Sequence, residues 1–124
     1  LYIVNAETRR LEYLSPAFER TWGESRAAVT DDLGRWLEMV HPDDRERAAE
    51  GLPQALAGQA PVLEYRIVRP DGGVRWIRDT GFAIRDGDGV VRRVGGVAQD
   101  VTASAVAEIA LAASERRLRS FIEG

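Results

Sequence analysis

A chain of 124 residues, with 44% hydrophobic and 30% charged side chains, fits one globular domain with a single core. It contains no Cys, which excludes disulfides, thiolate metal sites and Cys-linked cofactors, and its net charge of −3 argues against a general nucleic-acid-binding protein. The chain has no apolar run of about 18 residues and no basic-then-apolar leader, so we expect a cytoplasmic domain without membrane contact.

The first forty residues predict a β-hairpin followed by short helices. Aromatic and β-branched residues flank the polar break at 5–9, which is typical of a hairpin. Ser15 and Pro16 form a helix-start signature, with Ser15 as the expected cap, and Gly23 is the helix stop. The stretch 25–40 suggests one or two further helical turns. These turns should bring four apolar residues to the interior, namely Trp36, Leu37, Met39 and Val40.

A clearer helix is predicted from Pro42 to Gly58. Acidic residues in its first turn suit the positive end of the helix dipole. They are Asp43, Asp44 and Glu46. Pro53 lies inside the pattern, so we expect a kink or a break near Gly51 and Leu52.

The second half of the chain predicts three strands and a long helix. Glycine-containing turns at 71–73 and 86–89 separate the strands, and Asp-Gly between apolar runs is a strong hairpin signal. No Gly or Pro interrupts residues 103–123, which would form a helix about 30 Å long at 1.5 Å per residue. The predicted order is therefore two strands, a helical middle, three strands and a helix.

Four segments, in this order, resemble the PAS domain, in the subgroup where a Trp-Leu-x-x-x-His-Pro-Asp-Asp run precedes the central helix. The segments are YLSPAFERTWG at 13–23, WLEMVHPDDRERA at 36–48, EYRIVRPDGGVRWI at 64–77 and GVAQDVT at 96–102. The resemblance implies an α+β PAS fold, with a five-stranded antiparallel sheet, helices on one face and a C-terminal linker helix. Residues 1–102 would form the PAS domain, and 103–124 the signalling helix that leads to a following domain. Because the chain lacks a starting Met, we expect it to be a piece of a longer protein.

The resemblance also implies a function. PAS domains act as sensory or dimerisation modules in bacterial signalling proteins, commonly histidine kinases of two-component systems and diguanylate cyclases. Asp100, Val101 and Thr102 match the family triplet that joins the last strand to the output helix. We expect the Asp100 carboxylate to hold this junction and Thr102 to cap the helix amides, so that sheet movement is transmitted to the helix.

The space between the sheet and the helices is the candidate ligand pocket. Strand alternation turns Leu63, Tyr65 and Ile67 toward the core, and the family register adds residues from the next two strands. The predicted set is almost wholly apolar and comprises Met39, Leu52, Leu56, Leu63, Tyr65, Ile67, Ile77, Val94, Gly96 and Ala98. Such a set suits a small apolar ligand or a filled core without one. A ligand-binding sensor and a ligand-free dimerisation spacer therefore both remain open.

The middle strand of the second half gives two conflicting orientations for Trp76. Simple alternation turns Trp76 inward together with Val74, Phe82 and Ile84. The family register turns Trp76 to the outer face, where its ring can stack on Arg66. We adopt the family register, because the outer face of such sheets is often covered and can itself be apolar.

The final helix carries a weak heptad pattern. Its a and d positions are Ala107, Leu111, Ser114, Leu118 and Phe121. The pattern predicts a seam between two copies of the helix, and hence a homodimer. The alternative is an amphipathic linker helix that packs on its own sheet.

We expect no enzyme activity, metal site, haem or photoactive flavin. His41 is the only His and precedes Pro42, where a capping or buried structural role is expected, whereas haem-binding relatives carry their ligand within the central helix. Blue-light flavin relatives need a Cys in the helical middle and a Gln on the last strand. That strand position is Ala98 here, and Gln99 should face the other way. The run at 86–89 lacks the Glu of a calcium loop and is interpreted as a hairpin turn.

Overall fold

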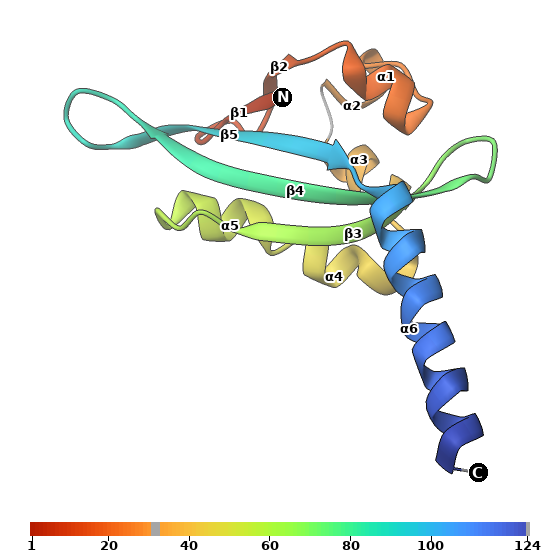
Figure 1. Cartoon of the computed structure of the whole chain (residues 1–124). Coiled ribbons are helices and arrows are strands. Elements are labelled where there is room, and N and C mark those ends of the chain that lie inside the picture. Colours follow the sequence, from red (N-terminus) through yellow and green to blue (C-terminus); the bar gives the residue numbers. More distant parts are fainter. Residues whose placement is uncertain (31–32, 124) are drawn as a thin grey trace.

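The computed structural model describes residues 1–30 and 33–123, and it is built on one antiparallel sheet of five strands in the order β2-β1-β5-β4-β3 (Figure 1). The strands are β1 (Tyr2–Asn5), β2 (Leu11–Leu14), β3 (Val62–Val68), β4 (Val74–Arg85) and β5 (Val91–Asp100). The N-terminal hairpin joins the C-terminal meander through β1, which pairs with β5. The five-stranded antiparallel sheet expected from the sequence is confirmed.

Short helices connect β2 to β3. They are α1 (Ala17–Trp22), α2 (Ala27–Thr30), α3 (Leu33–Met39), the 3-10 turn η1 (Pro42–Asp44), α4 (Arg45–Ala48) and α5 (Gly51–Leu56). Helical turns between 25 and 40 are confirmed, although Asp31 and Asp32 of that stretch lie outside the described residues. The helix predicted over 42–58 is instead divided into η1, α4 and α5. Its break lies at Ala49 and Glu50, just before the expected place, so Pro53 falls in the first turn of α5, where its missing N–H costs little.

The two ends of α1 behave differently from each other. Gly23 ends the helix in the left-handed conformation with φ of 70°, as expected for a glycine stop. The Ser15 side chain does not cap the helix, because Pro16 occupies the N-cap position without a side-chain hydrogen bond. The backbone carbonyl of Ser15 accepts the Phe18 N–H instead. The expected Ser15 cap is therefore wrong.

The strand register separates an inner face, which packs on the helices, from an outer face. Tyr65, Ile67 and Ile77 point inward and are fully buried, together with Val94 of β5. They pack against apolar residues of the helical segment, including Phe18, Trp22, Val29, Met39 and Ala48. The core therefore sits between one face of the sheet and the connecting helices.

Trp76 lies on the outer face. It pairs with Arg66 across β3 and β4, and the guanidinium carbon of Arg66 lies 5.4 Å from the centre of the Trp76 ring. Val74 and Phe82 also point outward, with 47% and 40% of their surfaces exposed. The family register and its cation–π pair are thus confirmed, and the inward orientation from simple alternation is wrong, because both faces of β4 carry apolar residues.

The last helix, α6 (Thr102–Glu123), starts directly after β5 and extends away from the sheet (Figure 1). No side chain within Thr102–Glu123 is buried. Packing of α6 along its own sheet is therefore not observed. Among the helices of the described ranges, none has the length and apolar character needed to cross a bilayer.

Candidate functional site: a cavity and an output junction

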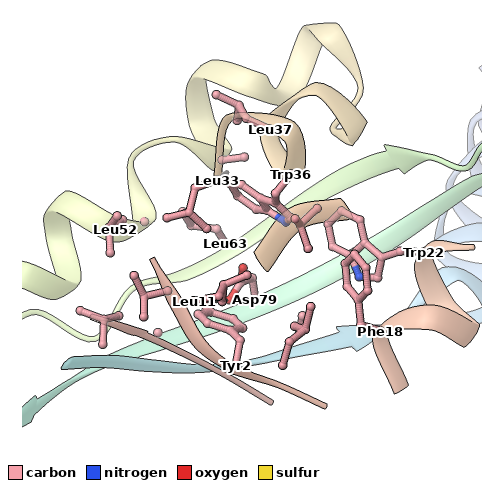
Figure 2. A pocket seen from close by; sticks show the side chains of 18 of the residues that line it. Tyr2, Leu11, Phe18, Trp22, Leu33, Trp36, Leu37, Leu52, Leu63 and Asp79 are labelled. Atoms are coloured by element: carbon pink, nitrogen blue, oxygen red, sulfur yellow. Dashed lines mark hydrogen bonds between the residues drawn. The ribbon is translucent and has the colours of Figure 1, made fainter. Parts of the chain in front are cut away.

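A cavity of about 340 Å³ lies between the inner face of the sheet and the helices (Figure 2). This volume falls within the range of roughly 300–1,000 Å³ that is typical of small-molecule sites. The rings of Phe18 and Trp22 lie at one end and Leu52 at the other, with Tyr2 and Asp79 between them. The interior is therefore not a filled core.

The structure divides the ten predicted pocket residues into two groups. Leu52, Leu63, Tyr65, Val94 and Ala98 line the cavity. Met39, Leu56, Ile67, Ile77 and Gly96 do not line it. Met39, Ile67 and Ile77 belong to the packed core, where side chains from the sheet and from α3 meet directly. The role of the cavity-lining group in ligand binding stays a prediction.

Gly96 is absent from the lining because the ring of Tyr2 covers it. Tyr2 and Gly96 are partners across β1 and β5, and both face inward. A Cβ atom on Gly96 would overlap the ring of Tyr2. The glycine therefore lets the tyrosine ring lie flat on the sheet, with its hydroxyl directed at β4.

Asp79 is a polar side chain in this mostly apolar cavity. It lies on the inner face of β4, opposite Ala98 of β5. The Tyr2 hydroxyl donates to Asp79 Oδ1 at 2.7 Å, and the Tyr65 hydroxyl donates to Asp79 Oδ2 at 2.8 Å. The three residues come from β1, β3 and β4, so this cluster connects strands on both sides of the central strand β5.

The protonation of this cluster follows from its burial. Burial raises the pKa of Asp79, while the hydrogen bonds from Tyr2 and Tyr65 oppose the rise. Burial and the neighbouring Asp79 carboxylate also raise the pKa of Tyr2 and of Tyr65 above the ordinary value for tyrosine. Both hydroxyls therefore stay protonated and act as donors to the carboxylate.

Sequence analysis missed Asp79 and Tyr2. The available signal was the inward position of Asp79, two residues after Ile77 on the same strand. An acidic residue at an inward position of a central strand requires buried partners. The alternation argument followed apolar residues and therefore passed over it.

Aromatic rings form one wall of the cavity. Trp36 contacts Tyr65 edge to face at 5.9 Å between ring centres, and Trp22 lies 6.2 Å from Trp36. Phe18 stacks on Trp22 at 5.3 Å. Tyr65 therefore belongs both to the aromatic wall and to the hydrogen-bonded cluster of Asp79.

His41 and Asp44 support the central helical turns. The Asp43 N–H donates to His41 Nδ1 at 3.1 Å, which confirms the capping role expected for this histidine. Asp44 is buried, and Arg66 donates to it from its backbone N–H and from two guanidinium nitrogens, at 2.8–2.9 Å. The Arg66 hydrogen bonds hold the pKa of Asp44 well below its usual range. Arg66 thus links this turn to β3 and, through its stacking, to Trp76.

The output junction is tied to β4 at Trp76. Asp100 Oδ1 accepts hydrogen bonds from the Thr102 N–H at 2.9 Å and from the Thr102 hydroxyl, as expected for a carboxylate that holds the junction. The Thr102 hydroxyl oxygen accepts the Trp76 N–H at 2.9 Å, and the Val101 N–H donates to the Trp76 carbonyl at 2.9 Å. The Thr102 hydroxyl therefore binds β4 rather than capping α6, which corrects that expectation. The signalling role of this triplet stays a prediction.

The residues predicted for a helical seam are all exposed. They are Ala107, Leu111, Ser114, Leu118 and Phe121. Leu111 and Leu118 are 60% and 62% exposed, and Phe121 is 85% exposed. An exposed row of this kind is available for a partner, and the homodimer stays a prediction.

The last strand does not place a glutamine in the cavity. Ala98 lines the cavity, whereas Gln99 pairs with Arg78 on the outer face and is exposed. The inner face of β5 therefore carries Ala98 at the position where, according to the family resemblance, blue-light flavin proteins carry a glutamine side chain. The absence of a photoactive flavin stays a prediction.

Comparison with known proteins agrees with this geometry. The family model of the PAS fold matches residues 11–98. The N-terminal domain of a diguanylate cyclase with a PAS/PAC sensor from Marinobacter aquaeolei is 27% identical, with a TM-score of 0.75, and the match covers 84% of this chain and 95% of that one. A sensory box histidine kinase/response regulator from Burkholderia thailandensis is 32% identical with a TM-score of 0.75, over 96% and 88% of the two chains.

The curated relatives are much longer than this chain. The non-motile and phage-resistance protein of Caulobacter vibrioides is 35% identical over 106 residues, which are 82% of this chain and 12% of that protein. The chain spans 30% or less of the length of the curated relatives that it matches. The chain thus belongs to the PAS-fold family, as a sensory domain of the kind that bacterial multidomain signalling proteins contain.

Proposed function

We propose that this PAS domain is a non-catalytic sensor that binds a small molecule in its cavity and transmits the binding event to α6. The observation that carries the proposal is the cavity of about 340 Å³ with a hydrogen-bonded carboxylate in its apolar lining. A ligand-free spacer has no need for such a space, because close packing of the core stabilises a domain. The proposed sensing role rests on the cavity and does not depend on which domain follows in the chain.

The proposed route of the signal is β4. Asp79 faces the cavity from this strand, and three residues earlier the backbone of Trp76 holds Val101 and Thr102. A ligand that shifts β4 therefore changes the position from which α6 leaves the sheet. Such a ligand shifts the equilibrium only if it binds the two arrangements with different affinities.

The proposed output is a change in a dimer. The exposed leucines of α6 support pairing of two copies along the helix, which would lead into a downstream histidine kinase or diguanylate cyclase domain in the cytoplasm. Two similar proteins, the diguanylate cyclase of Marinobacter aquaeolei and the sensory box histidine kinase of Burkholderia thailandensis, support this choice of output domain. A ligand-free dimerisation spacer is the second candidate, favoured by the same exposed row on α6, which needs no ligand to pair.

Native mass spectrometry of the purified chain, with an absorption spectrum of the same sample, separates the two candidates. The sensor predicts a reproducible mass difference that disappears on denaturation, or a rise in melting temperature when small apolar compounds are added. A bare protein mass, no visible absorption and no thermal response to any compound would favour the spacer. Haem or flavin would show itself in the same absorption spectrum.

A further inference from the structure

We propose that the cavity selects small molecules that combine an apolar body with a protonated amine, and that Asp79 binds the amine. The proposal deepens the sensor function argued above and rests on it. It concerns the chemical class of the ligand, which the apolar lining alone does not specify.

Asp79 has no cationic side chain paired with it among the described residues. The hydrogen-bond partners of its carboxylate are the neutral hydroxyls of Tyr2 and Tyr65. Within residues 1–30 and 33–123, no arginine forms an ion pair with it, in contrast to Asp44, which pairs with Arg66 and Arg47. Moving an ionised carboxylate out of water costs free energy unless a cation pairs with it. A cationic ligand would supply the charge that the cavity lacks.

The Asp79 carboxylate also keeps hydrogen-bonding capacity beyond its two tyrosine partners. An ionised carboxylate has about four acceptor sites on its two oxygens. Each oxygen of Asp79 accepts one tyrosine hydroxyl, and the residue lines the cavity. An ammonium group has three donors and fits this requirement. An anionic ligand would be repelled, and a purely apolar ligand would leave both oxygens with unused acceptor sites.

The aromatic wall of the cavity suits a cation as well as an apolar group. Trp22 and Trp36 line the cavity beside Tyr65, and these rings contact one another at 5.9–6.5 Å between centres. Aromatic faces attract cations and also stack on apolar groups. In Figure 2, Asp79 lies between this aromatic end and the aliphatic end at Leu52. A molecule with its amine near Asp79 would therefore place its apolar body against either end.

The test compares amines with alcohols of the same shape. Isothermal titration calorimetry of the purified chain would use two pairs, phenethylamine with phenethyl alcohol and benzylamine with benzyl alcohol. Tryptophan fluorescence gives a second readout, since Trp22 and Trp36 line the cavity. The amines are expected to bind about tenfold or more tightly than their alcohols, because a hydrogen bond to a charged group exceeds the 1.4 kcal/mol that corresponds to tenfold.

Two variants locate the preference. Asp79→Asn keeps the size of the side chain and removes its charge, so the amine preference should be lost while the alcohols bind as before. Asp88→Asn, at an exposed acidic residue in the turn between β4 and β5, should leave the preference intact. If Asp79→Asn does not fold by circular dichroism, Asp79→Ser replaces it, since it also removes the charge and should also lose the preference.

The outcomes are distinguishable. Equal binding of amines and alcohols, or a preference that survives in Asp79→Asn, would overturn the amine proposal and leave the sensor function standing, because the cavity would still bind small molecules. Binding of no compound, together with a bare mass in native mass spectrometry, would remove the sensor function and the amine proposal with it. A preference of at least tenfold that disappears only in Asp79→Asn would support both.

Discussion

The backbone N–H of Trp76 donates to the side-chain oxygen of Thr102, at 2.9 Å. This hydrogen bond joins the start of β4 to the first residue of α6, across 26 positions in the sequence. The reciprocal contact, from the Val101 N–H to the Trp76 carbonyl, fixes the same pair of segments. The start of α6 is therefore held by hydrogen bonds to β4, in addition to its covalent connection to the end of β5.

Replacement of Thr102 by Val should loosen this joint. Val has nearly the same shape but leaves the Trp76 N–H without its acceptor, so the variant should lose about 1–3 kcal/mol of unfolding free energy. Urea denaturation measures the loss, and hydrogen exchange of the Trp76 amide reports it locally. Thr102→Ser restores the hydroxyl and serves as the control. Unchanged stability and unchanged exchange in Thr102→Val would contradict the role given to this hydrogen bond.

Asp44→Asn should destabilise the domain by roughly 3 kcal/mol, because it leaves the Arg66 guanidinium without its buried charged partner. The Arg66 hydrogen bonds lower the pKa of Asp44 in the folded state relative to its ordinary value of 3.8. A lowered folded pKa contributes stability above the unfolded value, and that stability is lost as the pH falls below about 4.

The difference in urea stability between wild type and Asp44→Asn should therefore shrink in acid. Asp43→Asn is the matched control, since Asp43 is the adjacent residue and its side chain is 77% exposed. It should change stability little at any pH. A constant difference between wild type and Asp44→Asn from neutral pH down into acid would contradict this account of the Asp44–Arg66 pair.

Asp79 should give a pH dependence of the opposite sign. Its folded pKa is raised by burial above the ordinary value of 3.8, so the folded state binds its proton more tightly than the unfolded state does. Stability then falls as the pH rises from about 4 through the folded pKa. Without ligand, wild type should lose stability relative to Asp79→Asn over that window in urea denaturation. A wild type that gains stability over the same window would show that the tyrosine hydrogen bonds outweigh burial.

The fold of this domain could be predicted from the sequence better than the residues that line its cavity. The succession of strands and helices along the chain, the outward Trp76 and the Asp100 junction follow from local patterns and from the family resemblance, because each depends on neighbours along the chain or across one hairpin. The Tyr2–Asp79 hydrogen bond joins residues 77 positions apart and depends on the closure of the sheet through β1. No local pattern contains that information.

The same reasoning explains why only half of the predicted pocket set lines the cavity. Ile67, Ile77 and Leu63 share an inner face and similar side chains, yet Leu63 lines the cavity and the two isoleucines lie in the packed core. Ile67 and Ile77 belong to one buried cluster with Trp22 and Met39 of the helical segment, whereas Leu63 packs against the side of that cluster. Which inward residues meet a helix depends on where the helices lie, and strand alternation does not contain that information.

The exposed row on α6 predicts a dimer that two charges should disrupt. Leu111→Glu with Leu118→Glu places carboxylates at successive a positions of the proposed seam, so the two helices should repel each other and sedimentation velocity should show a monomer. Ile109→Glu with Ala113→Glu adds the same charge on the opposite side of the helix, at 100° per residue, and should leave the dimer intact. An unchanged sedimentation profile for the Leu111 and Leu118 variant would count against pairing through this row. A monomer in both variants would show that the added charge, rather than the leucine row, controls association.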